Sequence, residues 1–178
     1  AKIICRFILY FSVMKKLLLL LTISCISSSV LAQDWANLER FKKENSTIMK
    51  EQKKAQRVVF MGNSITEGWS NFDPDFFNEN QYINRGIGRQ TTPQMLLRFR
   101  QDVLDIKANT VVILAGINDI AENTGPITLN QILGNIISMC ELADQNNIRV
   151  ILCSVLPANN FPWQPKINPT QKVIELNK

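Results

Sequence analysis

Val58 to Gly68 read VVFMGNSITEG, an apolar run of strand length that ends in a turn of small residues. Short hydrophobic runs bounded by turn signals are typical of strands buried in a parallel sheet. The turn presents Ser64, and a helical pattern begins there. The same 178 residues contain no histidine. The stretch therefore offers a candidate nucleophile, while the side chain that most often activates a serine is absent from the sequence.

The rest of the chain alternates between short apolar runs and amphipathic helical patterns. Strands are expected at 57–61, 81–84, 110–115 and 149–153. Helices are expected from Thr92, as N-cap with Pro93 at the first helical position, from the cap Thr128, and from near Pro169. Residues 34–56 are charged and mostly helical in pattern. Buried strands that alternate with helices predict a parallel sheet covered by helices on both faces.

Charge is unevenly distributed along the sequence. The formal charge is +5, but residues 1–32 hold four basic and no acidic residues, which leaves 16 basic and 15 acidic residues in the remainder, a net charge of +1. Nucleic-acid binding depends on clustered surface cations, so this class of partner is not expected. With 46% of its 178 residues hydrophobic, the chain has the composition of one globular domain with a small extra segment.

The first 32 residues resemble a targeting segment. Met14-Lys15-Lys16 gives a start and a basic region, Leu17–Ile23 an apolar core, and Val30-Leu31-Ala32 the small residues that signal peptidase selects. We therefore expect a spurious upstream extension at 1–13, a signal peptide at 14–32 and the mature domain at 33–178. A retained membrane anchor is the alternative, although the apolar run is shorter than the roughly 20 residues of a spanning helix. A lipoprotein anchor at Cys25 is a weaker alternative, because Thr22 replaces the usual Leu.

Two cysteines remain after removal of the leader. Cys140 lies in a helical pattern and Cys153 near the end of a strand pattern. Both are expected to be packed thiols, since cysteine is among the most buried residue types, although an exported protein could oxidise them. The sequence has no metal-ligand spacing, so no metal site is predicted.

Polar residues follow three of the expected strands. Ser64 follows the first, the loop containing Gly88 and Arg89 follows the second, and Asn118 follows the third. In parallel sheets ligands bind beyond the carboxyl ends of the strands, where strand order reverses. If the second and third strands flank the first, as in a flavodoxin-like order, the three features converge on one site.

Each feature also has a purely structural interpretation. Ser64 and Glu67 fit a capping box at a helix start. Gly86 and Gly88 fit a turn that needs a positive φ, and Asn118-Asp119 fits another helix cap or an Asx-turn. Only their joint spacing favours a functional site.

That spacing resembles the SGNH hydrolases, also called GDSL-type esterases and lipases. Gly62-Asn63-Ser64 resembles the first block of this family, Gly86 to Thr91 the second, and Gly116-Ile117-Asn118-Asp119 the third. The resemblance spans Arg57 to about Pro157. It implies a flavodoxin-like three-layer α/β/α sandwich with a parallel sheet, and an acyl hydrolase that needs no cofactor.

The resemblance also implies roles for individual residues. Ser64 would be the nucleophile, and its backbone N–H one donor of the oxyanion hole. The Asn118 amide would be a second donor, and the second block would give a further N–H from Gly88 or, by ungapped matching, Arg89. Supporting residues would be Gly62, Asn63, Gly116 and Asp119. Asn63 replaces the family's Asp, which we expect to be tolerated, while the Arg89 side chain would narrow the pocket or favour acidic acyl groups.

The family's fourth block, Asp-x-x-His, has no counterpart in the sequence. We expect that the chain is truncated, with the last strand and helix of the fold missing, and that the fourth strand therefore leaves an exposed apolar edge. The alternative is a pseudoenzyme that binds carbohydrate or peptide at the same edge of the sheet. For the intact protein we expect an exported esterase, periplasmic or extracellular. Its partner would be a small-molecule or glycan ester, with acyl or carbohydrate O-acetyl groups cleaved, and no stable membrane insertion after signal cleavage.

Overall fold

Four parallel strands form a sheet with the order β2-β1-β3-β4 in the computed structural model of the protein. Their bounds are Val58–Gly62 for β1, Ile83–Gly86 for β2, Thr110–Leu114 for β3 and Arg149–Leu152 for β4. The second and third strands flank the first, and β1 and β3 lie in the middle of the sheet. The predicted parallel α/β fold is confirmed, because the chain reverses direction across the sheet after β2, as in a flavodoxin-like order.

The structure describes residues 14–15, 34–51 and 56–178. The expected extension at 1–13 lies outside the described residues, as does the expected signal peptide apart from Met14 and Lys15. Contacts divide the chain into Ala1–Trp35 and Ala36–Lys178, and the fold described here is that of the second unit. In the described part of the chain, no helix has the length and apolar character needed to cross a membrane.

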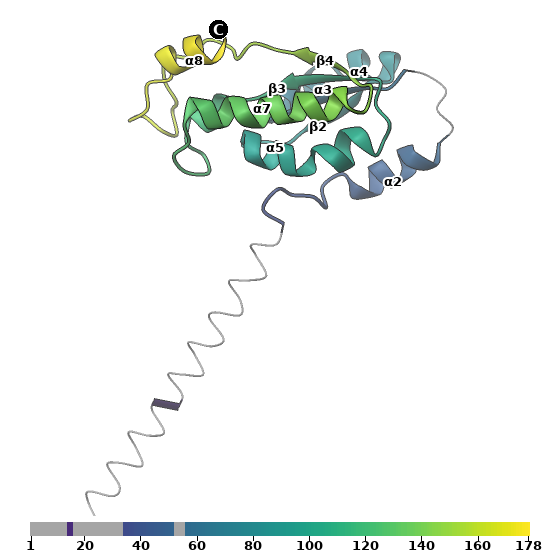
Figure 1. Ribbon diagram of the computed structural model, residues 1–178, viewed down its shortest axis with the longest axis horizontal. Helices are drawn as coiled ribbons and strands as arrows, with labels where there is room; N and C mark the ends of the chain where they lie inside the picture. The colour runs from purple at the N-terminus through teal and green to yellow at the C-terminus, as the bar shows by residue number, and fades with distance from the viewer. Residues whose placement is uncertain (1–13, 16–33, 52–55) are drawn as a thin grey trace, which may run out of the picture. The chain divides into compact units, whose positions relative to one another are not determined.

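Helices cover both faces of the sheet. On one face, α3 (Ser64–Phe72) contacts β1, β2 and α4 (Pro74–Asn80). On the other face, α5 (Thr92–Phe99) packs against α7 (Leu129–Asp144), and Figure 1 shows both in front of the sheet. This division follows from the right-handed connections between parallel strands.

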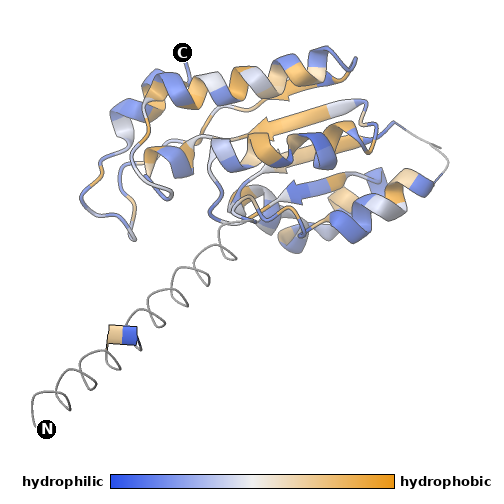
Figure 2. Ribbon diagram, turned by 60° about the horizontal axis from the view of Figure 1, so that its bottom comes forward, coloured by the Kyte–Doolittle hydropathy of each residue, from blue (hydrophilic) through white to orange (hydrophobic). Residues whose placement is uncertain are grey.

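Four further elements complete the described fold. Their bounds are Lys42–Lys50 for α2, Arg100–Leu104 for the π-helical turn η1 that continues α5, Ile117–Ile120 for α6 and Thr170–Leu176 for α8. The core lies between the sheet and the helices, where Val59, Met61, Phe99, Val111 and Ile113 are fully buried. Figure 2 shows the middle strands largely in orange, while β2, with the sequence INRG, is mostly polar.

That polarity explains a misplaced strand in the prediction. The second strand was expected at 81–84, whereas β2 spans Ile83–Gly86. Gln81 ends α4 with a φ of 55°, in the left-handed region, so it cannot continue a strand. Helix α4 was not predicted, because its sequence PDFFNEN has no clear apolar period.

The start of α5 also differs from the prediction by one residue. Thr91, not Thr92, is the N-cap, and it forms a capping box with Gln94. Thr92 is the first helical residue, because its N–H donates to the Asp119 carboxylate from α6. The predicted cap Thr128 of α7 is confirmed, with Gln131 as its capping-box partner.

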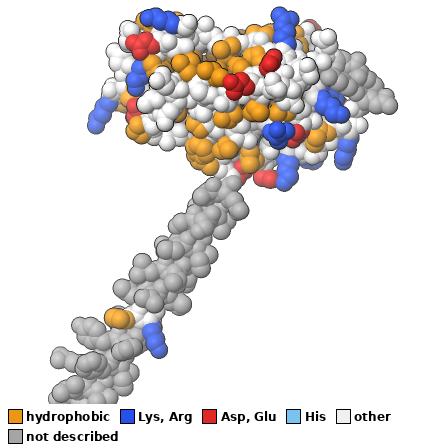
Figure 3. All heavy atoms as spheres, in the orientation of Figure 1, with side chains coloured by type: hydrophobic (Ala, Val, Ile, Leu, Met, Phe, Trp, Pro, Cys, Tyr) orange, Lys and Arg blue, Asp and Glu red, His pale blue; other side chains and the backbone are white. Residues whose placement is uncertain are grey.

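Several apolar side chains lie at the surface. Within the sheet β4 pairs with β3, and Ile151 and Leu152 of β4 are 41% and 56% exposed, as expected for an apolar edge. Figure 3 shows hydrophobic side chains on the face of α5 and α7, whose exposed members are Leu97, Leu133 and Ile137. Cys140 and Cys153 are free thiols and half-buried, so they are less enclosed than predicted. Burial raises the pKa of both thiols.

Candidate active site

Ser64 lies at the first position of α3, directly after the turn that ends β1. Asn63 is the N-cap, and its Oδ1 accepts a hydrogen bond from the Ile65 N–H at 3.0 Å. The predicted capping box of Ser64 and Glu67 is therefore absent, because the cap lies one residue earlier. Ser64 is exposed, and neither its hydroxyl nor its N–H has a hydrogen-bond partner among the described residues. The serine is thus available to an external group at a positively polarised helix end.

Two glycines set the position of this turn. Gly62 of β1 and Gly86 of β2 are paired in the sheet register. A Cβ on Gly62 would clash with the Thr66 side chain, and one on Gly86 would clash with the backbone of Glu67. Because both side chains are absent, the first turn of α3 lies directly against the two strands.

The loop after β2 lies beside Ser64. A Cβ on Gly88 would lie 3.9 Å from the Ser64 Cβ. However, the Gly88 N–H donates to Glu67 Oε2 at 2.8 Å, so this predicted oxyanion donor is already engaged. Arg89 is exposed and has a φ of 66°, in the left-handed region. Its N–H has no acceptor among the described residues, which leaves it as the open donor of the loop.

Asn118 lies in α6, after β3. Its Nδ2 donates to the backbone oxygen of Gln90 at 2.9 Å, so the amide is tied to the loop that contains Arg89. A primary amide has two N–H groups, and the second remains for another acceptor. Gly116, the N-cap of α6, has a φ of 116°, and a Cβ there would lie 2.6 Å from Leu176. Glycine is therefore needed for the turn that places Asn118.

Asp119 supports the site from behind. The carboxylate is fully buried and accepts the Thr92 N–H at 2.9 and 3.0 Å and the Thr92 hydroxyl at 2.6 Å. Burial raises its pKa from 3.8 to about 6, against the opposing effect of the hydrogen bonds from Thr92. Asp119 thus joins α6 to the start of α5 and does not face an external group.

Asn63 has one feature that its role as a cap does not explain. The side chain is 1% exposed, and its Nδ2 is buried with no hydrogen-bond partner among the described residues. Asn63 lines a small void of about 20 Å³ together with Ile65, Leu114 and Val155. The other side chains that line the void are apolar, so the Asn63 amide is left without a partner among the described residues.

A pocket of about 480 Å³ opens beside Ser64, at the edge of the sheet formed by β2. Residues of α2, α3 and β2 line it, and its polar members include Glu44, Ser64, Glu67, Asn71 and Asn84. Arg40, just before α2, also lines the pocket and forms an ion pair with Glu67 at 3.5 Å. The pocket therefore suits a polar group better than a long alkyl chain.

Sequence reasoning missed the roles of three residues of this region. Glu67 holds the Gly88 loop, Gln90 carries the oxygen that binds Asn118, and Arg98 contacts both Gln90 and the Gly62 carbonyl. The contact of Glu67 with Gly88 joins residues 21 apart, and no local pattern indicates it. Arg98 had one usable signal, since Asp102 follows at i+4 on the same helical face as buried apolar residues.

Comparison with known proteins agrees with this geometry. Residues 60–178 match the model of the GDSL-like lipase/acylhydrolase family. A candidate acylhydrolase of Bacteroides fragilis NCTC 9343 has 54% identity and a TM-score of 0.78, over 81% of this chain and 70% of that one. A GDSL-like lipase of Bacteroides thetaiotaomicron VPI-5482 has 53% identity and a TM-score of 0.78, over 81% of this chain and 71% of that one.

A further relative comes from Bacillus subtilis (strain 168), the uncharacterized lipoprotein YqeF. It is 32% identical over 118 residues, which are 56% of this chain and 48% of that protein. The chain thus spans about half the length of this curated relative. The family model matches most of the described fold, and the exposed serine after β1 and the two loops beside it agree with that match. The chain therefore belongs to the GDSL-like lipase/acylhydrolase family.

Proposed function

We propose that the protein is a serine ester hydrolase in which Ser64 is the nucleophile. The observation that carries the proposal is the exposed Ser64 at the start of α3, beside the loop to which Asn118 is bound. Family membership supports hydrolysis of acyl groups as the class of reaction.

The proposed mechanism follows from the donors around Ser64. The Ser64 Oγ attacks the ester carbonyl, and the carbonyl oxygen becomes an oxyanion. The Ser64 N–H, the Arg89 N–H and the second amide N–H of Asn118 would receive it. Loss of one such donor typically costs about 10²–10³ in rate. The tetrahedral intermediate then expels the alcohol, which takes up the proton that Ser64 has lost, and leaves an acyl-enzyme. Water cleaves this acyl-enzyme to the free acid and restores the Ser64 hydroxyl.

The proton acceptor for Ser64 is not among these groups. The resemblance implies a histidine, and none of the 178 residues is one. The proposal for the residues of this chain therefore covers the nucleophile and the oxyanion donors.

We infer that the substrates are small acyl esters or O-acetyl esters of carbohydrates. The polar lining of the pocket beside Ser64 supports a hydroxylated alcohol moiety. Export to the periplasm or the cell exterior is proposed as well, and it is supported by the leader pattern and by the name of the Bacillus subtilis relative.

Assay of the protein expressed from the full-length gene with 4-nitrophenyl acetate tests the proposal. The wild type should hydrolyse the ester, and Ser64→Ala should lower kcat by at least about 10³-fold, as expected when a nucleophile is removed. Equal rates for the two proteins would overturn the proposal.

Covalent labelling gives a second, independent readout. A fluorophosphonate probe should modify the wild type at Ser64, and peptide mass spectrometry should locate the adduct. A non-catalytic carbohydrate- or peptide-binding protein on the same fold would bind its ligand without becoming labelled.

A further inference from the structure

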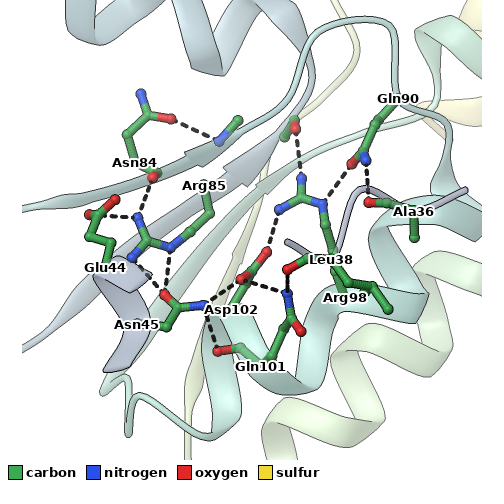
Figure 4. A network of polar contacts seen from close by, with 12 residues as sticks. Ala36, Leu38, Glu44, Asn45, Asn84, Arg85, Gln90, Arg98, Gln101 and Asp102 are labelled. Atoms are coloured by element: carbon green, nitrogen blue, oxygen red, sulfur yellow. Dashed lines mark hydrogen bonds and ion pairs between the residues drawn. The ribbon is translucent and has the colours of Figure 1, made fainter. Parts of the chain in front are cut away.

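Arg98 of α5 is a fully buried arginine that makes three directed hydrogen bonds. Its Nη1 donates to Asp102 Oδ2 at 2.9 Å, its Nε to Gln90 Oε1 at 2.6 Å, and its Nη2 to the Gly62 carbonyl at 3.2 Å. Figure 4 shows the guanidinium between Gln90 and Asp102. All three donor nitrogens of the side chain therefore have a defined partner.

These contacts reach each segment of the candidate site. Gly62 lies two residues before Ser64, and Gln90 directly follows Arg89. The backbone oxygen of Gln90 in turn accepts from the Asn118 amide at 2.9 Å. One side chain is thus bonded to the nucleophile turn, to the donor loop and, through one residue, to Asn118.

Stability alone does not account for this arrangement. Moving a guanidinium and a carboxylate out of water is costly, and apolar replacements of buried ion pairs are often neutral or stabilising. Burial lowers the pKa of Arg98, and the adjacent Asp102 opposes that effect. A planar guanidinium, however, fixes the directions of its hydrogen bonds more strictly than an apolar side chain fixes its contacts.

We propose that Arg98 is a positioning residue for the ester hydrolysis proposed above, an inference that rests on that function. The rigid guanidinium of Arg98 binds both the Gly62 carbonyl and the Gln90 side chain. It thereby sets the distance between Ser64 and the loop that contains Gly88 and Arg89. It acts on the oxyanion through the Arg89 N–H and Asn118 and does not touch the substrate.

A second buried arginine provides a matched control. Arg85 is also fully buried, and it donates to Asn45 Oδ1 at 3.1 and 2.7 Å and to Glu44 at 3.0 Å. Asn45 donates to Asp102 Oδ1 at 2.7 Å, so the two arginines belong to one network, which Figure 4 shows. Among the described residues, no hydrogen bond joins the Arg85 guanidinium to Gly62, Gln90 or Asn118.

The test compares Arg98→Met with Arg85→Met in the protein expressed from the full-length gene. Both substitutions disrupt the buried network, so both should lower the thermal midpoint. For Arg98→Met we expect kcat for 4-nitrophenyl acetate to fall about 10²-fold, because the oxyanion donors are misplaced. We expect KM to stay within about threefold, because the residues that bind the ester are not changed. For Arg85→Met we expect kcat within about threefold of the wild type.

A pair of variants at Gln90 tests the same link if Arg98→Met does not fold. Gln90→Glu keeps an acceptor for the Arg98 Nε, whereas Gln90→Leu removes it. We expect Gln90→Leu to lose at least about tenfold in kcat and Gln90→Glu to lie between Gln90→Leu and the wild type, because Glu keeps the acceptor for the guanidinium but loses the N–H that Gln90 donates to the Ala36 carbonyl.

The outcomes separate this inference from the proposed function. Folded Arg98→Met or Gln90→Leu protein that turns over the ester as fast as the wild type would overturn the positioning role, although the wild type is an active esterase. A wild type no more active than Ser64→Ala would overturn the proposed function and this inference with it.

Discussion

The carboxylate of Glu67 accepts a hydrogen bond from the backbone N–H of Gly88 at 2.8 Å. Glu67 lies one helical turn after Ser64, so the helix that presents the candidate nucleophile also holds the loop that presents Arg89, the proposed oxyanion donor. This bond uses the Gly88 N–H and leaves the Arg89 N–H open. Because of this bond, α3 and the loop that contains Gly88 and Arg89 cannot move independently without breaking a charge-assisted hydrogen bond.

Replacing Glu67 with Ala should therefore loosen the donor loop. We expect a loss of about 1–2 kcal/mol in the free energy of unfolding, measured in urea, because the Gly88 N–H loses a charged acceptor. We expect kcat to fall about tenfold, since the Arg89 N–H is then less well placed. Glu67→Gln keeps an acceptor oxygen and should lie between the wild type and Glu67→Ala. An Ala variant with unchanged stability would show that the bond contributes nothing to the fold.

The buried carboxylate of Asp119 should make stability depend on pH. Its folded pKa is raised from 3.8 to about 6, so the folded protein holds this proton more tightly than the unfolded chain does. The stability contributed by the protonated form is fully present below pH 3.8 and is lost as the pH rises to about 6. The loss attributed to Asp119 is on the order of 2–3 kcal/mol.

Urea denaturation at several pH values between about 3.5 and 7 measures this dependence. Asp119→Asn should remove the downward slope between about pH 4 and pH 6, because the variant has no proton to lose there. Asp75→Asn, a substitution in the first turn of α4, is the control and should keep the slope. The same slope in Asp119→Asn as in the wild type would contradict the assignment.

Arg89 should be replaceable by glycine without loss of the oxyanion donor. Its φ of 66° costs about 1–2 kcal/mol for a residue with a Cβ, and glycine adopts this region freely. The backbone N–H is kept, so Arg89→Gly should hydrolyse a neutral acetyl ester at a rate within about threefold of the wild type. The thermal midpoint should not fall. If the substitution instead slows turnover by about 10²-fold or more, the side chain itself takes part in the chemistry.

The tight contact at Gly86 should not tolerate even a methyl group. A Cβ there would clash with the backbone of Glu67, which cannot rotate away. We expect Gly86→Ala to destabilise the fold by about 1–3 kcal/mol and to reduce kcat, because α3 must shift and Ser64 moves with it. Thermal denaturation and the ester assay measure the two effects.

Gly134 of α7 is the matched control, since no atom lies within 4 Å of a Cβ built there. Gly134→Ala should stabilise the helix by up to about 1 kcal/mol and leave kcat unchanged. If the two alanine variants behave alike, the close approach of α3 to β2 does not determine the position of the serine.

The elements with strong local patterns were predictable from the sequence. The strands β1 and β3 are continuously apolar because both of their faces are covered, and Thr128 caps α7 through a local contact with Gln131. The placement of Ser64, the Gly88 loop and Asn118 at one edge of the sheet was predictable because the carboxyl ends of parallel strands share an edge, and the structure brings Gly88 close to Ser64 and bonds Asn118 to Gln90.

The missed features depend on contacts between distant residues. The strand β2 is held by Asn84, whose Oδ1 accepts from Gly86 and whose Nδ2 donates to the Thr66 carbonyl, so it needs no apolar run. The cap of α5 moved to Thr91 because Asp119 takes the Thr92 N–H. Arginine usually lies at the surface, whereas Arg98 is fully buried. Its burial depends on hydrogen-bond partners, Gln90 and Gly62, that lie in other segments of the chain.

The facing glycines Gly62 and Gly86 have a consequence for how this scaffold can diversify. Main-chain contact between α3 and the two strands sets the height of Ser64 above the sheet, and of the residues that line the pocket, Asn84 and Glu67 also hold this turn through hydrogen bonds. Residues that line the pocket, such as Asn71 and Glu44, can therefore be exchanged without disturbing the attacking oxygen. Libraries that randomise Asn71 and Glu44 and keep Ser64, Glu67, Asn84 and both glycines should yield variants whose preference for the alcohol changes while the rate with 4-nitrophenyl acetate is kept.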